Sequence, residues 1–131
     1  MKYLLDTSIF LWIAGPAEKL NSQARSLLSG NEAELYLSAA SSWEIGIKYA
    51  LGKLELPQPP TRYVPRRLGD LAIQSLAITN EHAFATMSLP SHHDDPFDRM
   101  LMAQARKEDM VLLTADKLIK QYSIEIFWCG R

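Results

Sequence analysis

Short apolar runs alternate with amphipathic helical segments along the chain, and this alternation restricts the possible folds more than any other feature. The runs are three to six residues long, and all but the last precede a segment with helical periodicity. Continuous apolar strands connected through helices are typical of a parallel sheet covered on both faces. We therefore predict an α/β fold whose strands lie at residues 3–5, 35–37, 73–78, 111–113 and 124–128.

The predicted helices have recognisable start and stop residues. Residues 96–107 follow Asp95-Pro96-Phe97-Asp98, which places a capping acid first, proline at the first helical position and a second acid at the third. The remaining helices are predicted at residues 9–14, 22–28, 41–51, 62–68 and 79–87, with a brief one ending at residue 121. With 131 residues and no evident linker, the chain is predicted to form a single domain, 1–131.

Charge and cysteine content limit the possible partners and compartments. The net charge of −1 and pI of about 6.3 give no overall basic field that would attract nucleic acid. The local basic cluster, Lys53 with Arg62, Arg66 and Arg67, is either a solvated helix face, a track for an RNA backbone or a contact for an acidic partner.

A single cysteine, Cys129, excludes a disulfide within the chain and favours a reducing, cytoplasmic location. Asp6 interrupts the apolar N-terminal run, which argues against a signal peptide, and no run reaches the length of a membrane span.

Acidic residues recur where predicted elements meet. Asp6 follows the first strand directly, and Asp116 follows the fourth strand by two residues. Glu44 and Asp98 are both predicted in the first turn of a helix. In an open α/β sheet, ligands bind beyond the carboxyl ends of the strands. We therefore expect these four carboxylates to lie at one rim of the sheet.

Each acid also has a purely structural explanation. Asp6 and Asp116 are suitable helix caps, Ser41 with Glu44 has the spacing of a capping box, and Asp98 suits a helix start. Four acids in one crevice nevertheless require compensation, because two carboxylates 4 Å apart repel by about 4 kcal/mol at an effective dielectric constant of 20. A hard divalent cation, Mg²⁺ or Mn²⁺, would supply it and would suit phosphodiester chemistry.

The motifs Asp6-Thr7-Ser8, SAASSWEIGIKYALGKL around Glu44, LPSHHDDPFDRMLMAQA and LLTAD resemble those of PIN-domain proteins. More narrowly, the chain is similar to the small VapC-like toxins of bacterial type II toxin–antitoxin pairs. The resemblance covers nearly the whole chain, and the segment DPFDRMLMAQA with the spacing of the acids is its most specific part.

This resemblance implies a PIN-like three-layer α/β/α sandwich with a central, mainly parallel sheet of four to five strands. It implies an endoribonuclease whose Asp6, Glu44, Asp98 and Asp116 hold Mg²⁺ or Mn²⁺ and whose products carry a 5′-phosphate and a 3′-hydroxyl. It also implies a cytoplasmic protein that binds a cognate antitoxin and forms a homodimer, with apolar faces near the N-terminus available as an interface.

Further residues near the acids are candidates for supporting them or for touching the substrate: Ser8, His92, His93, Asp95, Arg99 and Thr114. Ser8 and Thr114 match hydroxyl positions of the family or serve as helix caps. Arg99 is predicted either to hold a phosphate or to form a salt bridge. The two histidines either contact RNA or lie on a solvated loop. The three tryptophans, Trp12, Trp43 and Trp128, are predicted to fill core or interface.

Other functions remain open from the sequence. A PIN nuclease without an antitoxin, in RNA processing or DNA repair, would carry the same acids. A non-catalytic binding module is disfavoured because all four acids are present. A phosphate-transfer protein of the receiver or dehalogenase kind also begins with a strand-end Asp, but Thr7 and Ser8 follow Asp6 where a second acid is often found. The RNA target does not follow from these residues.

Overall fold

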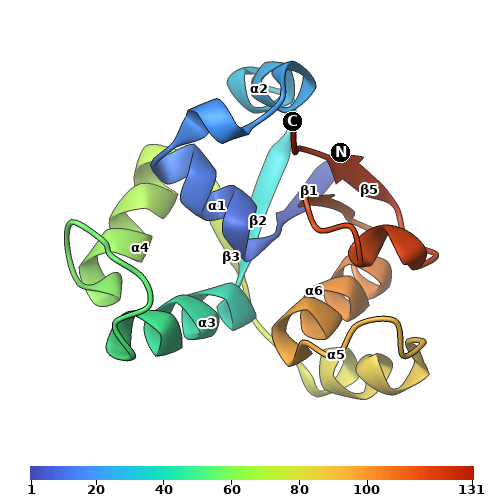
Figure 1. Cartoon of the computed structure of the whole chain (residues 1–131). Helices are drawn as coiled ribbons and strands as arrows, with labels where there is room; N and C mark the ends of the chain where they lie inside the picture. The colour runs from blue at the N-terminus through green and yellow to red at the C-terminus, as the bar shows by residue number, and fades with distance from the viewer.

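The centre of the molecule is a five-stranded sheet in which every neighbouring pair is parallel (Figure 1). The computed structural model describes residues 1–131 and orders the strands β3-β2-β1-β4-β5. The strands are β1 (Lys2–Leu5), β2 (Glu34–Ser38), β3 (Ile73–Leu76), β4 (Val111–Thr114) and β5 (Ile126–Trp128). All five predicted strands are present, which confirms the α/β fold.

Helices cover both faces of the sheet, so the molecule has three layers. Successive strand residues alternate between two separate apolar cores: Leu4 and Leu112 belong to one, and Leu5 and Leu113 to the other. The helices are α1 (Thr7–Ala14), α2 (Ser22–Ser29), α3 (Ala39–Ala50), α4 (Pro60–Asp70), α5 (Asn80–Ala85) and α6 (Pro96–Lys107).

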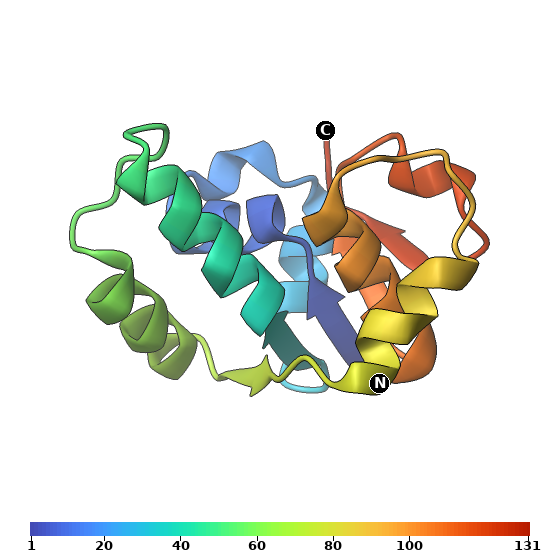
Figure 2. The same cartoon turned by 90° about the horizontal axis from the view of Figure 1, so that it is seen from below.

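The core that contains Leu5 and Leu113 includes residues from α1, α2 and α4. Helix α6 supplies much of the core that contains Leu4 and Leu112, and α3 contributes one residue to each core. Figure 2 shows α4 at one end of the molecule and α5 with α6 toward the other. Three short 3₁₀ segments, Ala17–Lys19, Thr86–Ser88 and Ile119–Gln121, complete the secondary structure. No helix combines the length and apolar character that a membrane crossing requires.

Several element boundaries differ from the sequence prediction. The third strand ends at Leu76, and the fifth begins only at Ile126. The helix predicted over residues 79–87 is α5 followed by a tighter 3₁₀ turn. The brief helix predicted near residue 121 is a 3₁₀ turn as well.

Helix α3 begins two residues earlier than predicted, and its cap is different. Ser38 caps it by accepting a hydrogen bond from the Ala40 N–H at 3.0 Å. Ser41 lies inside the helix, where its buried hydroxyl accepts a 2.8 Å hydrogen bond from Thr7 Oγ1. The predicted capping box of Ser41 and Glu44 is therefore wrong, and Glu44 lies in the second turn rather than the first.

The strand order fixes where a ligand would bind. Strand β1 lies at the centre, and the chain leaves it toward β2 and β3 on one side before returning to β4 and β5 on the other. The direction of winding thus reverses between β1 and β4, whose register pairs Leu5 with Leu113. A crevice beyond the carboxyl ends of two such strands is the usual ligand site of open α/β sheets.

Candidate active site

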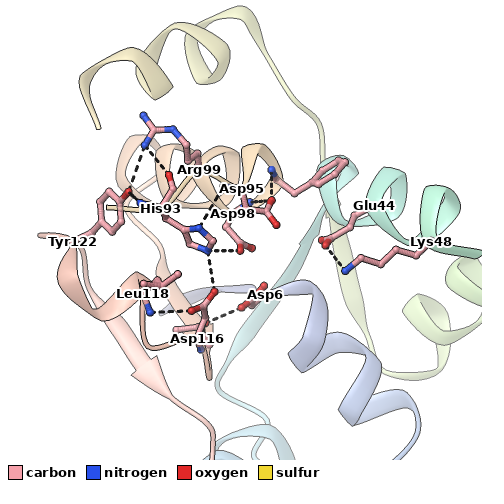
Figure 3. Close-up of polar contacts among 12 residues, drawn as sticks. Asp6, Glu44, Lys48, His93, Asp95, Asp98, Arg99, Asp116, Leu118 and Tyr122 are labelled. Carbon is pink, nitrogen blue, oxygen red and sulfur yellow. Dashed lines mark hydrogen bonds and ion pairs between the residues drawn. The ribbon is translucent and has the colours of Figure 1, made fainter. Parts of the chain in front are cut away.

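Carboxylates from four separate segments meet at this crevice. Asp6 follows β1, Asp116 follows β4, Asp98 lies in the first turn of α6, and Glu44 projects from α3. All four line one cavity of about 520 Å³. In Figure 3 the side chains of Asp6, Asp98 and Asp116 lie close together, with Glu44 farther along the same space. The structure thus brings together the four acids that were selected from the sequence.

Thr114 links two of these acids at the end of β4. Its Oγ1 donates a 2.8 Å hydrogen bond to Asp6 Oδ2 and accepts one from the Asp116 N–H at 3.1 Å. Although Asp6 occupies the cap position of α1, its side chain does not cap the helix. The structural explanation of Asp6 as a helix cap is therefore wrong, and its buried carboxylate faces the cavity instead.

Asp98 and Asp116 approach each other on either side of His93. The His93 Nε2 lies 2.8 Å from Asp98 Oδ2 and 3.0 Å from Asp116 Oδ2. The second oxygen of Asp116, Oδ1, accepts a 2.9 Å hydrogen bond from the Leu118 N–H. One carboxylate oxygen of Asp98 and one of Asp116 lie within 4.8 Å of each other, which would allow both acids to bind one metal ion.

Glu44 is 6% exposed and only partly paired. Its Oε2 contacts Lys48 Nζ at 2.8 Å, whereas its buried Oε1 has no hydrogen-bond partner. A buried carboxylate oxygen without a partner is costly, because it has lost its hydration without replacement. The unpaired oxygen, together with the all-oxygen acid set, fits a hard divalent cation such as Mg²⁺ or Mn²⁺.

The clustering of acids shifts their proton affinities. Burial raises the pKa of Asp6 to about 6, with repulsion from Asp116 and Glu44 adding to the shift and the Thr114 hydrogen bond opposing it. Burial also raises the pKa of Asp98 to about 7, and the charges of Asp6 and Asp95 act in the same direction. These shifts record the cost of concentrated negative charge, which a bound cation would offset.

The pKa values of two basic side chains at the acids are raised as well, because the neighbouring negative charge stabilises their protonated forms. Burial lowers the pKa of His93, but the hydrogen bond to Asp116 and the charges of Asp98 and Asp116 outweigh it, so the net shift is upward. The hydrogen bond to Glu44 raises the pKa of Lys48.

The remaining sequence candidates take different positions. Asp95 caps α6, since its Oδ1 accepts from the N–H groups of Phe97 and Asp98 at 2.8 and 3.2 Å. Ser8 is exposed at the cavity wall. His92 is exposed and packs edge-on against Tyr122, with ring centroids 5.2 Å apart.

Arg99 is neither ion-paired nor free to hold a phosphate. Its guanidinium makes five hydrogen bonds of 2.7 to 3.4 Å, four of them to carbonyl oxygens of the preceding loop and turn. The acceptors are the carbonyl oxygens of Thr86, Leu89, Pro90 and His93 and the hydroxyl of Tyr122. The salt bridge predicted as one alternative is absent, because loop carbonyls occupy the donor positions.

Sequence reasoning missed other residues of the cavity. Trp12, which was predicted to fill core or interface, lines the cavity one helical turn after Ser8. Lys48 and Lys117 line it as well and are its basic residues. The i,i+4 spacing of Glu44 and Lys48 was a usable signal for one of them. The sequence gives no corresponding signal for Lys117.

Comparisons with known proteins agree with this architecture. The model of the PIN domain matches residues 3–125. The chain is 38% identical over 61 residues to Ribonuclease VapC16 of Mycobacterium tuberculosis, a match that covers 47% of this chain and 43% of that relative. The chain therefore aligns with less than half the length of the curated relative.

Solved structures share the fold at low sequence identity. A chain in the complex of VapBC2 from Rickettsia felis with a DNA fragment superposes with a TM-score of 0.75 at 14% identity, covering 99% of this chain and 100% of that one. A chain of DNA-bound VapBC from Salmonella typhimurium gives a TM-score of 0.65 at 17% identity, with 98% of each chain covered.

Proposed function

The chain belongs to the PIN-domain family, and from this premise we propose that it is a metal-dependent endoribonuclease that acts as a VapC-like toxin. The observation that carries the proposal is the meeting of Asp6, Glu44, Asp98 and Asp116 in one cavity. The buried Oε1 of Glu44 has no hydrogen-bond partner, which supports a cation-binding site in the same cavity. The named ribonuclease relative supports RNA as the substrate.

Asp6, Asp98 and Asp116 would hold Mg²⁺ or Mn²⁺, and Glu44 would complete the ligand set or orient the attacking water. The bound cation would supply a lowered pKa for that water and positive charge for the phosphoryl oxygens. Thr114 keeps the Asp6 carboxylate turned into the cavity through its 2.8 Å hydrogen bond. Lys48 and Lys117, on the cavity wall, are placed to attract the RNA backbone.

We propose that the attacking water forms a bond to phosphorus and displaces the 3′-oxygen, as the resemblance to PIN nucleases implies. The products would then carry a 5′-phosphate and a 3′-hydroxyl. The acids contribute fixed negative charge and the lysines contribute positive charge at the rim, so the cavity is preorganised before the substrate arrives.

We further propose an antitoxin as the protein partner, because the solved structures that share the fold include VapBC complexes. A homodimer is proposed as well. The large exposed apolar side chains Trp43 and Phe84 lie on α3 and α5, and Met87 lies on the 3₁₀ turn after α5. On α1, by contrast, Ile9 and Phe10 are fully buried. We therefore place the proposed dimer interface at the exposed Trp43 on α3 and the apolar hollow beside it, rather than at the N-terminal helix.

RNA cleavage by the purified chain tests the function directly. We expect pooled cellular RNA to be cut in the presence of Mn²⁺ or Mg²⁺ and to stay intact with chelator. Asp98→Asn should reduce cleavage by at least 100-fold, because it removes one charged ligand from the proposed cation site. The fragments should carry 5′-phosphates, which a 5′-phosphate-dependent exonuclease detects.

The matched control is Asp94→Asn, which removes an exposed acid four residues earlier that does not line the carboxylate cavity. This variant should keep wild-type cleavage. Full activity of the folded Asp98→Asn variant would overturn the assigned site. Cutting of DNA but not RNA would replace the ribonuclease proposal with a deoxyribonuclease.

A further inference from the structure

His93 joins two acids that belong to different elements. Asp98 lies at the start of α6 and Asp116 lies beyond β4, yet both place an Oδ2 within 3.0 Å of the same Nε2 atom. The imidazole is largely buried, with its side chain 11% exposed. One side chain thus spans the gap between the two carboxylates on the β4 side of the cavity (Figure 3).

The other ring nitrogen determines what Nε2 does. The Asp95 N–H donates a 3.3 Å hydrogen bond to His93 Nδ1. Nδ1 therefore acts as the acceptor, and the ring proton is on Nε2. A histidine that binds a metal through one nitrogen normally donates a hydrogen bond from the other, which is the opposite arrangement. The geometry makes Nε2 a donor to Asp116 Oδ2, in close contact with Asp98 Oδ2, and not a metal ligand.

The loop that carries His93 is held in place from outside the cavity. Tyr122 accepts a 2.8 Å hydrogen bond from the His93 N–H and donates one of 2.9 Å to the Pro90 carbonyl. Arg99 donates to the carbonyl oxygens of Pro90 and His93 from the other side. These contacts fix the backbone of the loop, so the imidazole is directed to the acids without support from a ligand.

We propose that His93 is a positioning residue that sets the separation and orientation of Asp98 and Asp116 for cation binding. This inference rests on the proposed function, because it assigns the two acids to a metal site. The Nε2–H donates to Asp116 Oδ2, and the same nitrogen lies 2.8 Å from Asp98 Oδ2. These contacts reduce the number of carboxylate orientations that a bound cation would otherwise have to select. His92, the adjacent histidine, makes no polar contact with either acid and has no such role.

Binding of Mn²⁺ to the full chain tests this inference without any activity measurement. Electron paramagnetic resonance of free Mn²⁺ gives the dissociation constant for the wild type, His93→Leu, His93→Gln and His92→Leu. We expect His93→Leu to weaken binding about 10-fold or more, in line with the loss of an outer partner of a metal ligand. His93→Gln should recover part of the affinity, because its amide N–H donates a hydrogen bond, and His92→Leu should match the wild type.

Pulsed electron paramagnetic resonance separates positioning from direct coordination. We expect no directly coordinated nitrogen on the bound Mn²⁺ of the wild type. A coordinated ¹⁴N signal that disappears in His93→Gln would overturn the inference, because it would make His93 a ligand. Equal or tighter Mn²⁺ binding by His93→Leu would overturn it as well.

The two proposals fail in different ways. Absence of Mn²⁺ binding by the wild type would reject the metal site itself, and with it this inference. Wild-type binding that no His93 substitution alters would reject only the positioning role. If His93→Leu unfolds, the decision passes to His93→Gln, whose affinity must then lie below that of the wild type and of His92→Leu.

Discussion

At the scale of single residues, Asp6 shows that a residue of the proposed site can lower the stability of the folded state. Its carboxylate is 5% exposed and lies beside other acids, so burial and repulsion raise its pKa to about 6. In the unfolded chain the same group ionises near pH 4. Between these values the folded state binds more protons than the unfolded state, and stability falls as pH rises through this window.

This difference predicts that Asp6→Asn stabilises the metal-free protein at pH 7.5. A shift of about two pKa units corresponds to roughly 3 kcal/mol, which the uncharged amide would recover. Urea unfolding in chelator, at pH 4 and at pH 7.5, measures the effect: the variant should exceed the wild type at pH 7.5 and approach it at pH 4. The exposed Glu32→Gln should show no such gain. An Asp6→Asn variant less stable than wild type at pH 7.5 would contradict the prediction.

Some residues of the candidate site could be predicted from the sequence, whereas the position of others could not. Asp6 and Asp116 were identifiable because each follows an apolar strand, and the ends of parallel strands share an edge. For His93, the sequence predicted only that it and the adjacent His92 either contact RNA or lie on a solvated loop. Its orientation depends on Tyr122, 29 residues farther along the chain. A contact between residues so far apart in the chain produces no local sequence pattern from which it could be predicted.

At the scale of elements, the loop before α6 is organised by a residue inside the helix. Arg99 lies one turn into α6 and spreads its guanidinium over four loop and turn carbonyl oxygens. The planar group has five donors in a fixed arrangement, which suits several acceptors at once, whereas a lysine presents a single ammonium on a flexible stem. Arg99 of the DPFDR segment therefore holds the loop before α6, and it does so directly beside the proposed catalytic acid Asp98.

We accordingly predict that Arg99→Lys destabilises the protein by about 2 kcal/mol, because several carbonyl oxygens, three of them in partly buried hydrogen bonds, lose their partner. Thermal unfolding measures the loss, and hydrogen exchange of the His93 amide should rise, since that N–H lies in the released loop. Arg106→Lys, at the other end of α6, is the control and should change neither quantity. An Arg99→Lys variant with wild-type stability would show that the carbonyl contacts contribute little.

Element boundaries were less predictable than element types. The capping box assigned to Ser41 and Glu44 had the correct spacing, but the observed cap is Ser38, three residues before Ser41. Ser41 instead satisfies Thr7 across a buried contact between α1 and α3. Capping preferences depend on neighbouring residues, whereas the start of α3 depends on tertiary packing, which the neighbouring residues do not reveal.

At the scale of the whole molecule, exposed apolar surface points to self-association. Trp43 is 64% exposed, Phe84 68% and Met87 82%. A hollow of about 480 Å³ beside Trp43 is lined mostly by apolar side chains, including Phe97, whose ring meets that of Trp43 edge-on at 5.1 Å. An apolar hollow beside an exposed tryptophan is the kind of surface that marks interaction sites on globular proteins.

We therefore predict that Trp43→Glu converts a homodimer into a monomer, because it places a charge in the proposed interface. Light scattering after size-exclusion chromatography gives the mass directly. Leu118→Glu introduces the same charge at another exposed apolar position, after β4, and should leave the dimer intact. A wild-type chain that is monomeric at all concentrations, or a Trp43→Glu variant that stays dimeric, would reject this surface as the interface.

The position of the first strand also has a consequence for synthesis. Strand β1 is synthesised before β4 but pairs with it, and Thr114, which donates a hydrogen bond to Asp6, lies 108 residues later in the chain. Until β4 and the residues after it have been synthesised, the carboxylate cavity lacks Ala115, Asp116 and Lys117. We therefore expect the proposed hydrolytic activity to depend on this last part of the chain, so that fragments that end before residue 111 would be inert even without a bound antitoxin.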